Sequence, residues 1–113
     1  MWRDAAWVLD ILNACRRVMK YARGLTEDQF LQSEIEQDAI LRQLTIAGEA
    51  AKRVSADFRG AHPEVPWKKV ASSRDVVVHD YFRVDPKEVW RIVRDEVPPL
   101  VSVLGPLVPP DEG

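Results

Sequence analysis

Cysteine is almost absent from this chain: Cys15 is the only one among 113 residues. A single cysteine excludes an internal disulfide, and it excludes the multi-thiolate sites that bind zinc or iron–sulfur clusters. Long apolar runs are missing as well, since no stretch reaches the roughly 18 uncharged apolar residues that a membrane-spanning helix needs. The N-terminus does not follow the plan of a signal peptide, because Asp10 interrupts its apolar run. We therefore expect a cytoplasmic protein with no membrane association.

Neither sign of charge predominates, because 16 lysines and arginines stand against 18 aspartates and glutamates, for a net charge of −2. This balance does not indicate nucleic-acid binding by the whole surface, so any RNA contact has to come from a local basic patch. Charged helix faces are usually just solvated, but two basic pairs are candidates for tracking an RNA backbone. These are Lys52, Arg53, Lys68 and Lys69. Gly-rich phosphate loops and metal-ligand clusters are absent, so we expect no cofactor and no metal.

Strand patterns are also missing, since no window alternates at the two-residue period of a strand. Apolar residues recur instead at helical spacing, which predicts long helices over residues 4–22, 33–58 and 67–82. A last helix is expected to begin at Asp85-Pro86 and to kink or end at Pro98-Pro99, with the same apolar face continuing to Leu104. Short connections then predict one all-α domain over residues 1–104, an antiparallel up-and-down four-helix bundle with a short extra helix. Residues 105–113 are expected to form a flexible, proline-rich tail.

Local signals place several helix ends and one apolar face. Gly24 is expected to end the first helix, and Thr26 with Gln29 forms a capping-box pattern for the short extra helix. The first helix is expected to bury one row of apolar residues, namely Val8, Leu12, Cys15, Met19 and Ala22. On that face Cys15 is predicted to be a small buried hydrophobe rather than a nucleophile.

The most informative segment runs from Arg74 to Tyr81, where an arginine, a carboxylate, an imidazole and a phenol follow within two turns of one expected helix. Residues four apart share a helix face, so Asp75 is predicted to lie beside His79. Arg74 and His79 are five apart, about 140° around the helix, and do not share one face. A polar cluster flanked by apolar helix costs stability unless it is hydrated, paired or used. We take this segment as the candidate functional site.

The chain resembles the HepT-like family of HEPN domains over nearly its whole length. The resemblance rests on three segments in order: Ile46-Ala-Gly-Glu-Ala-Ala-Lys-Arg, His62-Pro-Glu-Val-Pro-Trp67 and Arg74-Asp-x-x-x-His79-x-Tyr81-Phe82. It implies a four-helix bundle that forms a homodimer and cleaves RNA, either tRNA or mRNA, without a metal. It also implies a toxin of a toxin–antitoxin module whose partner is a minimal nucleotidyltransferase.

The same resemblance assigns roles to four residues. Arg74 and His79 match the catalytic pair, Asp75 matches the polar position that orients the histidine, and Tyr81 matches the tyrosine that the partner modifies with AMP. The chemistry suits these roles, since an imidazole moves protons near neutral pH and a forked guanidinium binds phosphoryl oxygens. The alternative is a non-catalytic adaptor or nucleotide-binding module that docks a nucleotidyltransferase. The Arg74–His79 pair favours the ribonuclease, because a scaffold has no need of it.

Overall fold

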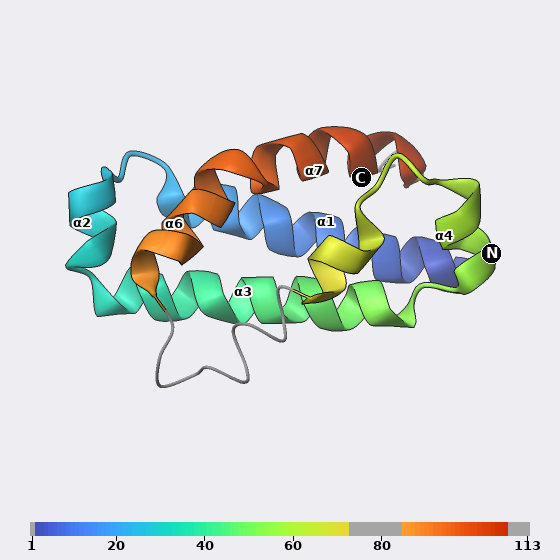
Figure 1. Ribbon diagram of the computed structural model, residues 1–113, viewed down its shortest axis with the longest axis horizontal. Helices are drawn as coiled ribbons and strands as arrows, with labels where there is room; N and C mark the ends of the chain where they lie inside the picture. The colour runs from blue at the N-terminus through green and yellow to red at the C-terminus, as the bar shows by residue number, and fades with distance from the viewer. Residues whose placement is uncertain (1, 73–84, 109–113) are drawn as a thin grey trace, which may run out of the picture.

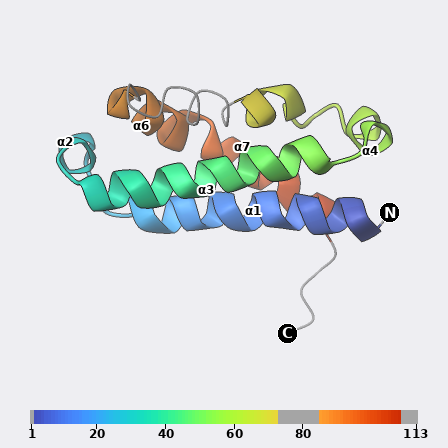
Figure 2. The same ribbon diagram turned by 90° about the horizontal axis from the view of Figure 1, so that it is seen from below.

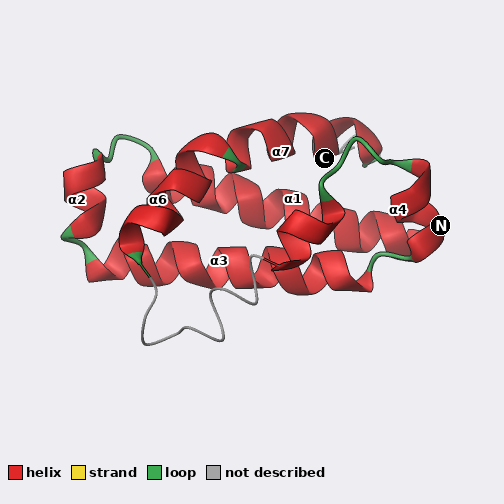
Figure 3. Cartoon of the chain, viewed as in Figure 1, coloured by secondary structure: helices red, strands yellow, loops and turns green. Residues whose placement is uncertain are grey.

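The computed structural model describes residues 2–72 and 85–108, and this part of the chain contains helices and no strand (Figure 1, Figure 3). The predicted all-α fold is therefore confirmed. Residues 67–72 are also helical. The other elements are α1 Trp2–Ala22, α2 Glu27–Leu31, α3 Glu34–Arg53, α4 Ala56–Ala61, α6 Pro86–Asp95, α7 Val97–Leu104 and the 3-10 helix η2 Gly105–Leu107.

The two longest helices, α1 and α3, lie side by side and run in opposite directions (Figure 1, Figure 2). Helix α7 packs along α1, while α2 and α4 lie at opposite ends of the bundle (Figure 1). Helix α3 and the pair α6–α7 both run opposite to α1 (Figure 1). Among the described helices, none is long and apolar enough to cross a membrane.

The core between these helices is one continuous apolar cluster. Its largest fully buried members are Phe30, Ile11, Leu12, Ile40, Leu104, Val8, Val18, Val54 and Cys15. The expected burial of Cys15 is confirmed, whereas the expected burial of Met19 is wrong, because its side chain is 38% exposed. The buried row on α1 passes through Cys15 and Val18, and Met19 is rotated about 100° beyond Val18, toward solvent.

The helix ends predicted from local sequence signals are found in the structure. Gly24 has a positive φ of 80°, the left-handed conformation that ends a helix. The backbone N–H of Gln29 donates to the Thr26 hydroxyl at 3.2 Å, and the Gln29 side chain accepts from the Thr26 N–H at 2.9 Å. At α6, the Asp85 carboxylate accepts a hydrogen bond from the N–H of Lys87 at 3.0 Å.

The single long helix expected over residues 33–58 is wrong, because α3 ends at Arg53 and a separate helix, α4, begins at Ala56. Ser55 caps α4 by accepting from the N–H of Phe58 at 3.1 Å. The buried carboxylate of Asp4 accepts from both the N–H and the hydroxyl of Ser55, each at 2.8 Å. These bonds, the backbone one foremost, lower the pKa of Asp4. The break therefore depends on a partner 51 residues away in the sequence.

The last helix was expected to kink or end at Pro98-Pro99. It is interrupted slightly earlier, at Glu96, where α6 ends and α7 begins. Pro98 and Pro99 then occupy the first turn of α7, where a missing N–H costs no helical hydrogen bond. The chain continues past Leu104 as η2, and Leu107 and Val108 pack against the core. The packed part of the chain thus reaches Val108.

Candidate functional site

The four residues of the predicted motif, Arg74, Asp75, His79 and Tyr81, lie outside the described residues. Their roles therefore stay predictions from the sequence. The described structure shows how the chain is held on either side of them. Residues 67–72 approach the motif from its N-terminal side, and α6 begins shortly after it.

The N-terminal flank is fixed by a buried tryptophan. Trp67 is 7% exposed, and its indole Nε1–H donates to the carbonyl of His62 at 2.9 Å. Its ring meets the ring of Phe58 edge-on, with 6.0 Å between centroids. Phe58 also packs on the His62 ring at 4.5 Å. The helix that leads into the motif thus starts from a position set by α4 and the loop after it.

The C-terminal flank is fixed by α6. Its inner face is buried at Val89 and Val93, and Trp90 packs on Phe30 of α2 with 5.0 Å between ring centroids. The cap at Asp85 defines where this helix begins. Both ends of the segment that contains the motif are therefore attached to the folded bundle.

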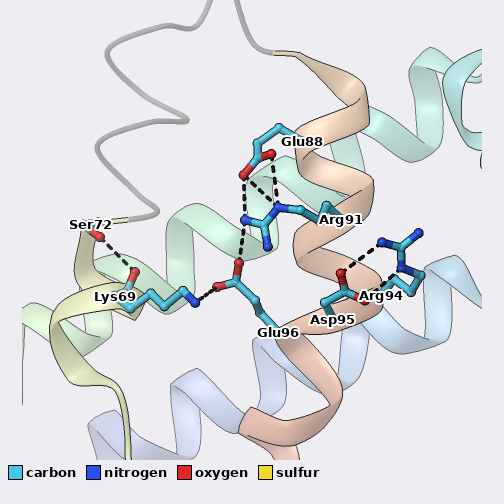
Figure 4. A network of polar contacts seen from close by, with 7 residues as sticks. All are labelled: Lys69, Ser72, Glu88, Arg91, Arg94, Asp95 and Glu96. Atoms are coloured by element: carbon cyan, nitrogen blue, oxygen red, sulfur yellow. Dashed lines mark hydrogen bonds and ion pairs between the residues drawn. The ribbon is translucent and has the colours of Figure 1, made fainter.

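A chain of ion pairs joins the two flanks (Figure 4). Lys69 Nζ lies 3.4 Å from Glu96 Oε1, and Glu96 Oε2 lies 2.7 Å from an Nη of Arg91. The same guanidinium contacts Glu88 at 2.6 Å, and its hydrogen bond lowers the pKa of Glu88. These side chains are partly or largely solvated, so salt screens their attraction and their contribution to stability is small. These ion pairs serve mainly to position the two flanks, since they link residues 67–72 to α6 and to the start of α7.

On one side of residues 66–70 lies a pocket of about 420 Å³ between α6, α7 and the α1–α3 layer. Its inner wall is apolar and includes Leu44 and the Cys15 thiol, whose pKa burial raises to about 12. A thiol in that state is protonated at neutral pH and is not a nucleophile. The charged residues that line the pocket are Glu64, Asp95, Glu96 and Lys69. Three carboxylates against one amine make this pocket unfavourable for phosphate.

On the other side of the same segment lies an open groove of about 740 Å³ between α4 and residues 63–71, which we call the α4 groove. Lys68 and Lys69, both predicted RNA contacts, line it together with Arg59. None of the described residues that line it is acidic.

The other two predicted RNA contacts, Lys52 and Arg53, do not line this groove. Arg53 lies instead over the Trp7 ring of α1, with its guanidinium carbon 5.2 Å from the ring centroid. Lys52 is exposed near the end of α3.

Arg59 is the residue of the α4 groove that sequence reasoning missed. The sequence predicted one helix over residues 33–58, so Arg59 fell just beyond the end of that expected helix. The signal that would have found it is the cap at Ser55, which starts α4 and places Arg59 on a short helix beside residues 63–71. Among the described residues, no group of three or more histidine, cysteine or carboxylate side chains is placed to hold a metal ion.

The fold defines the class of protein first: an all-helical bundle of the HEPN type. Residues 11–106 match the family described as Ribonuclease HepT-like, and the chain belongs to this family. The matched range includes the whole Arg74–Tyr81 segment.

Several named relatives agree with this assignment. The chain is 37% identical over 91 residues to "Probable ribonuclease HepT" of Thermococcus cleftensis, which covers 80% of this chain and 83% of the relative. It is 33% identical over 108 residues to a Methanocaldococcus jannaschii protein named as a "Putative RNase", covering 96% and 89% of the two chains. A protein with the same description in Caldanaerobacter subterraneus is 34% identical over 90 residues, or 80% of each chain. No solved structure was found to match the chain.

Proposed function

We propose that this protein is a cytoplasmic ribonuclease that cleaves RNA without a metal. The observation that carries the proposal is the Arg74–His79 pair, which lies within the range matched to the HepT-like family. The names of the relatives, which are those of ribonucleases, support the same activity. Both segments that flank the motif are anchored in the bundle, which suits a site that has to position an RNA strand.

The proposed reaction is an internal transfer at phosphorus. The 2′-hydroxyl of one ribose attacks the adjacent phosphodiester, a new P–O bond forms, and the 5′-oxygen of the next nucleotide leaves. His79 acts in proton transfer, in which the 2′-hydroxyl gives up its proton and the leaving 5′-oxygen gains one. Arg74 stabilises the charge that develops on the phosphoryl oxygens, and Asp75 orients His79. The products are a 2′,3′-cyclic phosphate and a free 5′-hydroxyl.

The proposal extends to a homodimer that acts as the toxin of a toxin–antitoxin module. Arg74 and His79 are five residues apart, so two copies related by a twofold axis would supply both groups to one cleft. The proposed antitoxin is a minimal nucleotidyltransferase that transfers AMP to Tyr81. An added phosphate beside Arg74 would compete with RNA for the guanidinium.

Cleavage by the purified protein tests the activity. We expect tRNA or mRNA to be cut at the same rate with and without EDTA, because no step needs a metal ion. The new ends should be 2′,3′-cyclic phosphates, detected by end mapping. An RNA with one 2′-deoxy substitution at the mapped position should stay intact there. Cleavage that stops with EDTA and returns with Mg²⁺ would contradict the proposed mechanism.

Mass spectrometry tests the modification. Co-expression with the cognate nucleotidyltransferase is expected to add the mass of one AMP, and Tyr81→Phe is expected to prevent this completely. Tyr21→Phe is the matched control, because Tyr21 is the only other tyrosine and is half-buried on α1. An adduct that persists in Tyr81→Phe would remove Tyr81 from the proposal.

A further inference from the structure

We infer that the α4 groove guides the phosphodiester backbone of the RNA, with Arg59 and Lys68 as its contacts. This inference rests on the proposed ribonuclease function and adds to it the path of the substrate. The relevant surface lies outside the motif, on described residues of α4 and of the segment 63–71.

The charge of the groove supports this occupant. Arg59, Lys68 and Lys69 line one groove, and none of the described residues that line it is acidic, in a chain whose net charge is −2. A local run of cations with no carboxylate is what a polyanion requires on a protein that is acidic overall. The open shape of the groove suits an extended strand rather than an enclosed small molecule.

The three cations differ in how far they are already engaged. Lys69 contacts Glu96 at 3.4 Å, so part of its charge is neutralised. Lys68 is exposed and forms no ion pair with another described residue. Within the described part of the chain, Arg59 Nε is buried without a hydrogen-bond partner. A buried guanidinium N–H without an acceptor is unfavourable, so turning this side chain onto a phosphate would gain a charge-assisted bond.

The position of the groove places the proposed RNA path near the motif. The pocket on the opposite side of residues 66–70 has three carboxylates, which repel a polyanion and leave the α4 side as the favoured one. Lys68 precedes Arg74 by six residues, and six residues of chain span at most about 20 Å. A strand held in the α4 groove therefore lies within reach of the segment that contains the motif.

The test measures RNA binding in a His79→Ala background, which keeps the RNA intact. The dissociation constant of a labelled single-stranded RNA is measured by fluorescence anisotropy over a series of salt concentrations. We expect Arg59→Gln combined with Lys68→Gln to weaken binding on the order of tenfold at low salt. The slope of log K against log[salt] should decrease in magnitude by about 0.7 for each cation removed.

Arg16→Gln combined with Arg17→Gln is the matched control, because it removes the same charge from exposed positions on α1. This control should leave both the affinity and the slope near those of the parent. Circular dichroism of each variant shows that the bundle is folded.

The outcomes separate this inference from the proposed function. If the α4 groove variant and the α1 control bind RNA equally while the wild-type protein cleaves it, the groove is not the RNA path and the ribonuclease proposal stands. If the wild-type protein cleaves no RNA, the ribonuclease proposal fails whatever the binding shows. If the groove variant keeps its RNA affinity but no longer retains the nucleotidyltransferase, the groove is a protein-docking surface and the inference is overturned.

Discussion

Replacing His79 by alanine is expected to reduce RNA cleavage by at least about a hundredfold, because positioned acid–base groups contribute roughly 10²–10⁴ in rate. The protein should stay folded, since an imidazole used in catalysis is not needed to fill the core. The measurement is the single-turnover rate of cleavage of a defined RNA by wild type and variant at equal concentration. Induction of the variant in cells should no longer arrest growth.

The other histidine supplies the control. His62 contacts Glu64 at 3.3 Å and packs on Phe58, and its carbonyl accepts the indole N–H of Trp67. The structure thus gives His62 a local packing role, and a backbone carbonyl survives a change of side chain. We expect His62→Ala to retain cleavage, with at most a modest loss of stability.

Substitutions of Arg74 separate charge from geometry. Arg74→Ala should lose cleavage as His79→Ala does, and Arg74→Lys should recover only part of it, because an ammonium keeps the charge without the two-pronged donor.

Undiminished cleavage by His79→Ala, with contaminating nucleases excluded, would remove His79 from the mechanism. Growth arrest that survives both Arg74→Ala and His79→Ala would favour the adaptor alternative.

The parts of the fold that the sequence predicted well are those set by neighbouring residues. The reciprocal hydrogen bonds of Thr26 and Gln29, the positive φ of Gly24 and the Asp85 cap all involve residues at most three apart. Such interactions are encoded in short stretches of sequence, so a pattern can reveal them. The all-α class followed in the same way from helical periodicity.

The features that the sequence did not predict depend on distant partners. Ser55 is a local cap for α4, but no residue near it indicates that the carboxylate of Asp4 will also bind it, at the point where α3 and α4 separate. Because that break was missed, Arg59 could not be grouped with Lys68 in one groove. The separation of Arg53 from Lys68 likewise reflects its contact with Trp7, which lies 46 residues earlier.

The largest expected loss of stability comes from Phe30→Ala. Phe30 is fully buried although it belongs to α2, a helix of only five residues. So short a helix is not stable in isolation, and its position therefore depends on packing of this side chain. Removing a buried phenylalanine ring costs about 3–5 kcal/mol, a large share of the roughly 5–15 kcal/mol by which small domains are stable. Guanidinium denaturation should show this as a strongly lowered midpoint.

Two control variants make the prediction specific to the ring. Phe30→Leu refills much of the volume and should cost clearly less than Phe30→Ala, so it remains measurable if the alanine variant does not fold. Ile35→Ala removes a large side chain that is 80% exposed and should change the free energy of unfolding by no more than about 0.5 kcal/mol. Equal effects of Phe30→Ala and Ile35→Ala would contradict the described packing of α2.

Replacing Phe30 should also loosen the C-terminal flank of the candidate site. The Phe30 ring packs on Trp90 of α6, the helix that follows the motif segment. Under conditions where Phe30→Leu is still folded, α6 would be held less firmly at its α2 contact while the Trp67 anchor at the other flank is unchanged. We therefore expect hydrogen exchange to accelerate in α2 and α6 before it does so in α1 and α3. Uniform acceleration across all four helices would instead mean that α2 and α6 unfold only together with the whole bundle, so that this flank of the motif has no local freedom of its own.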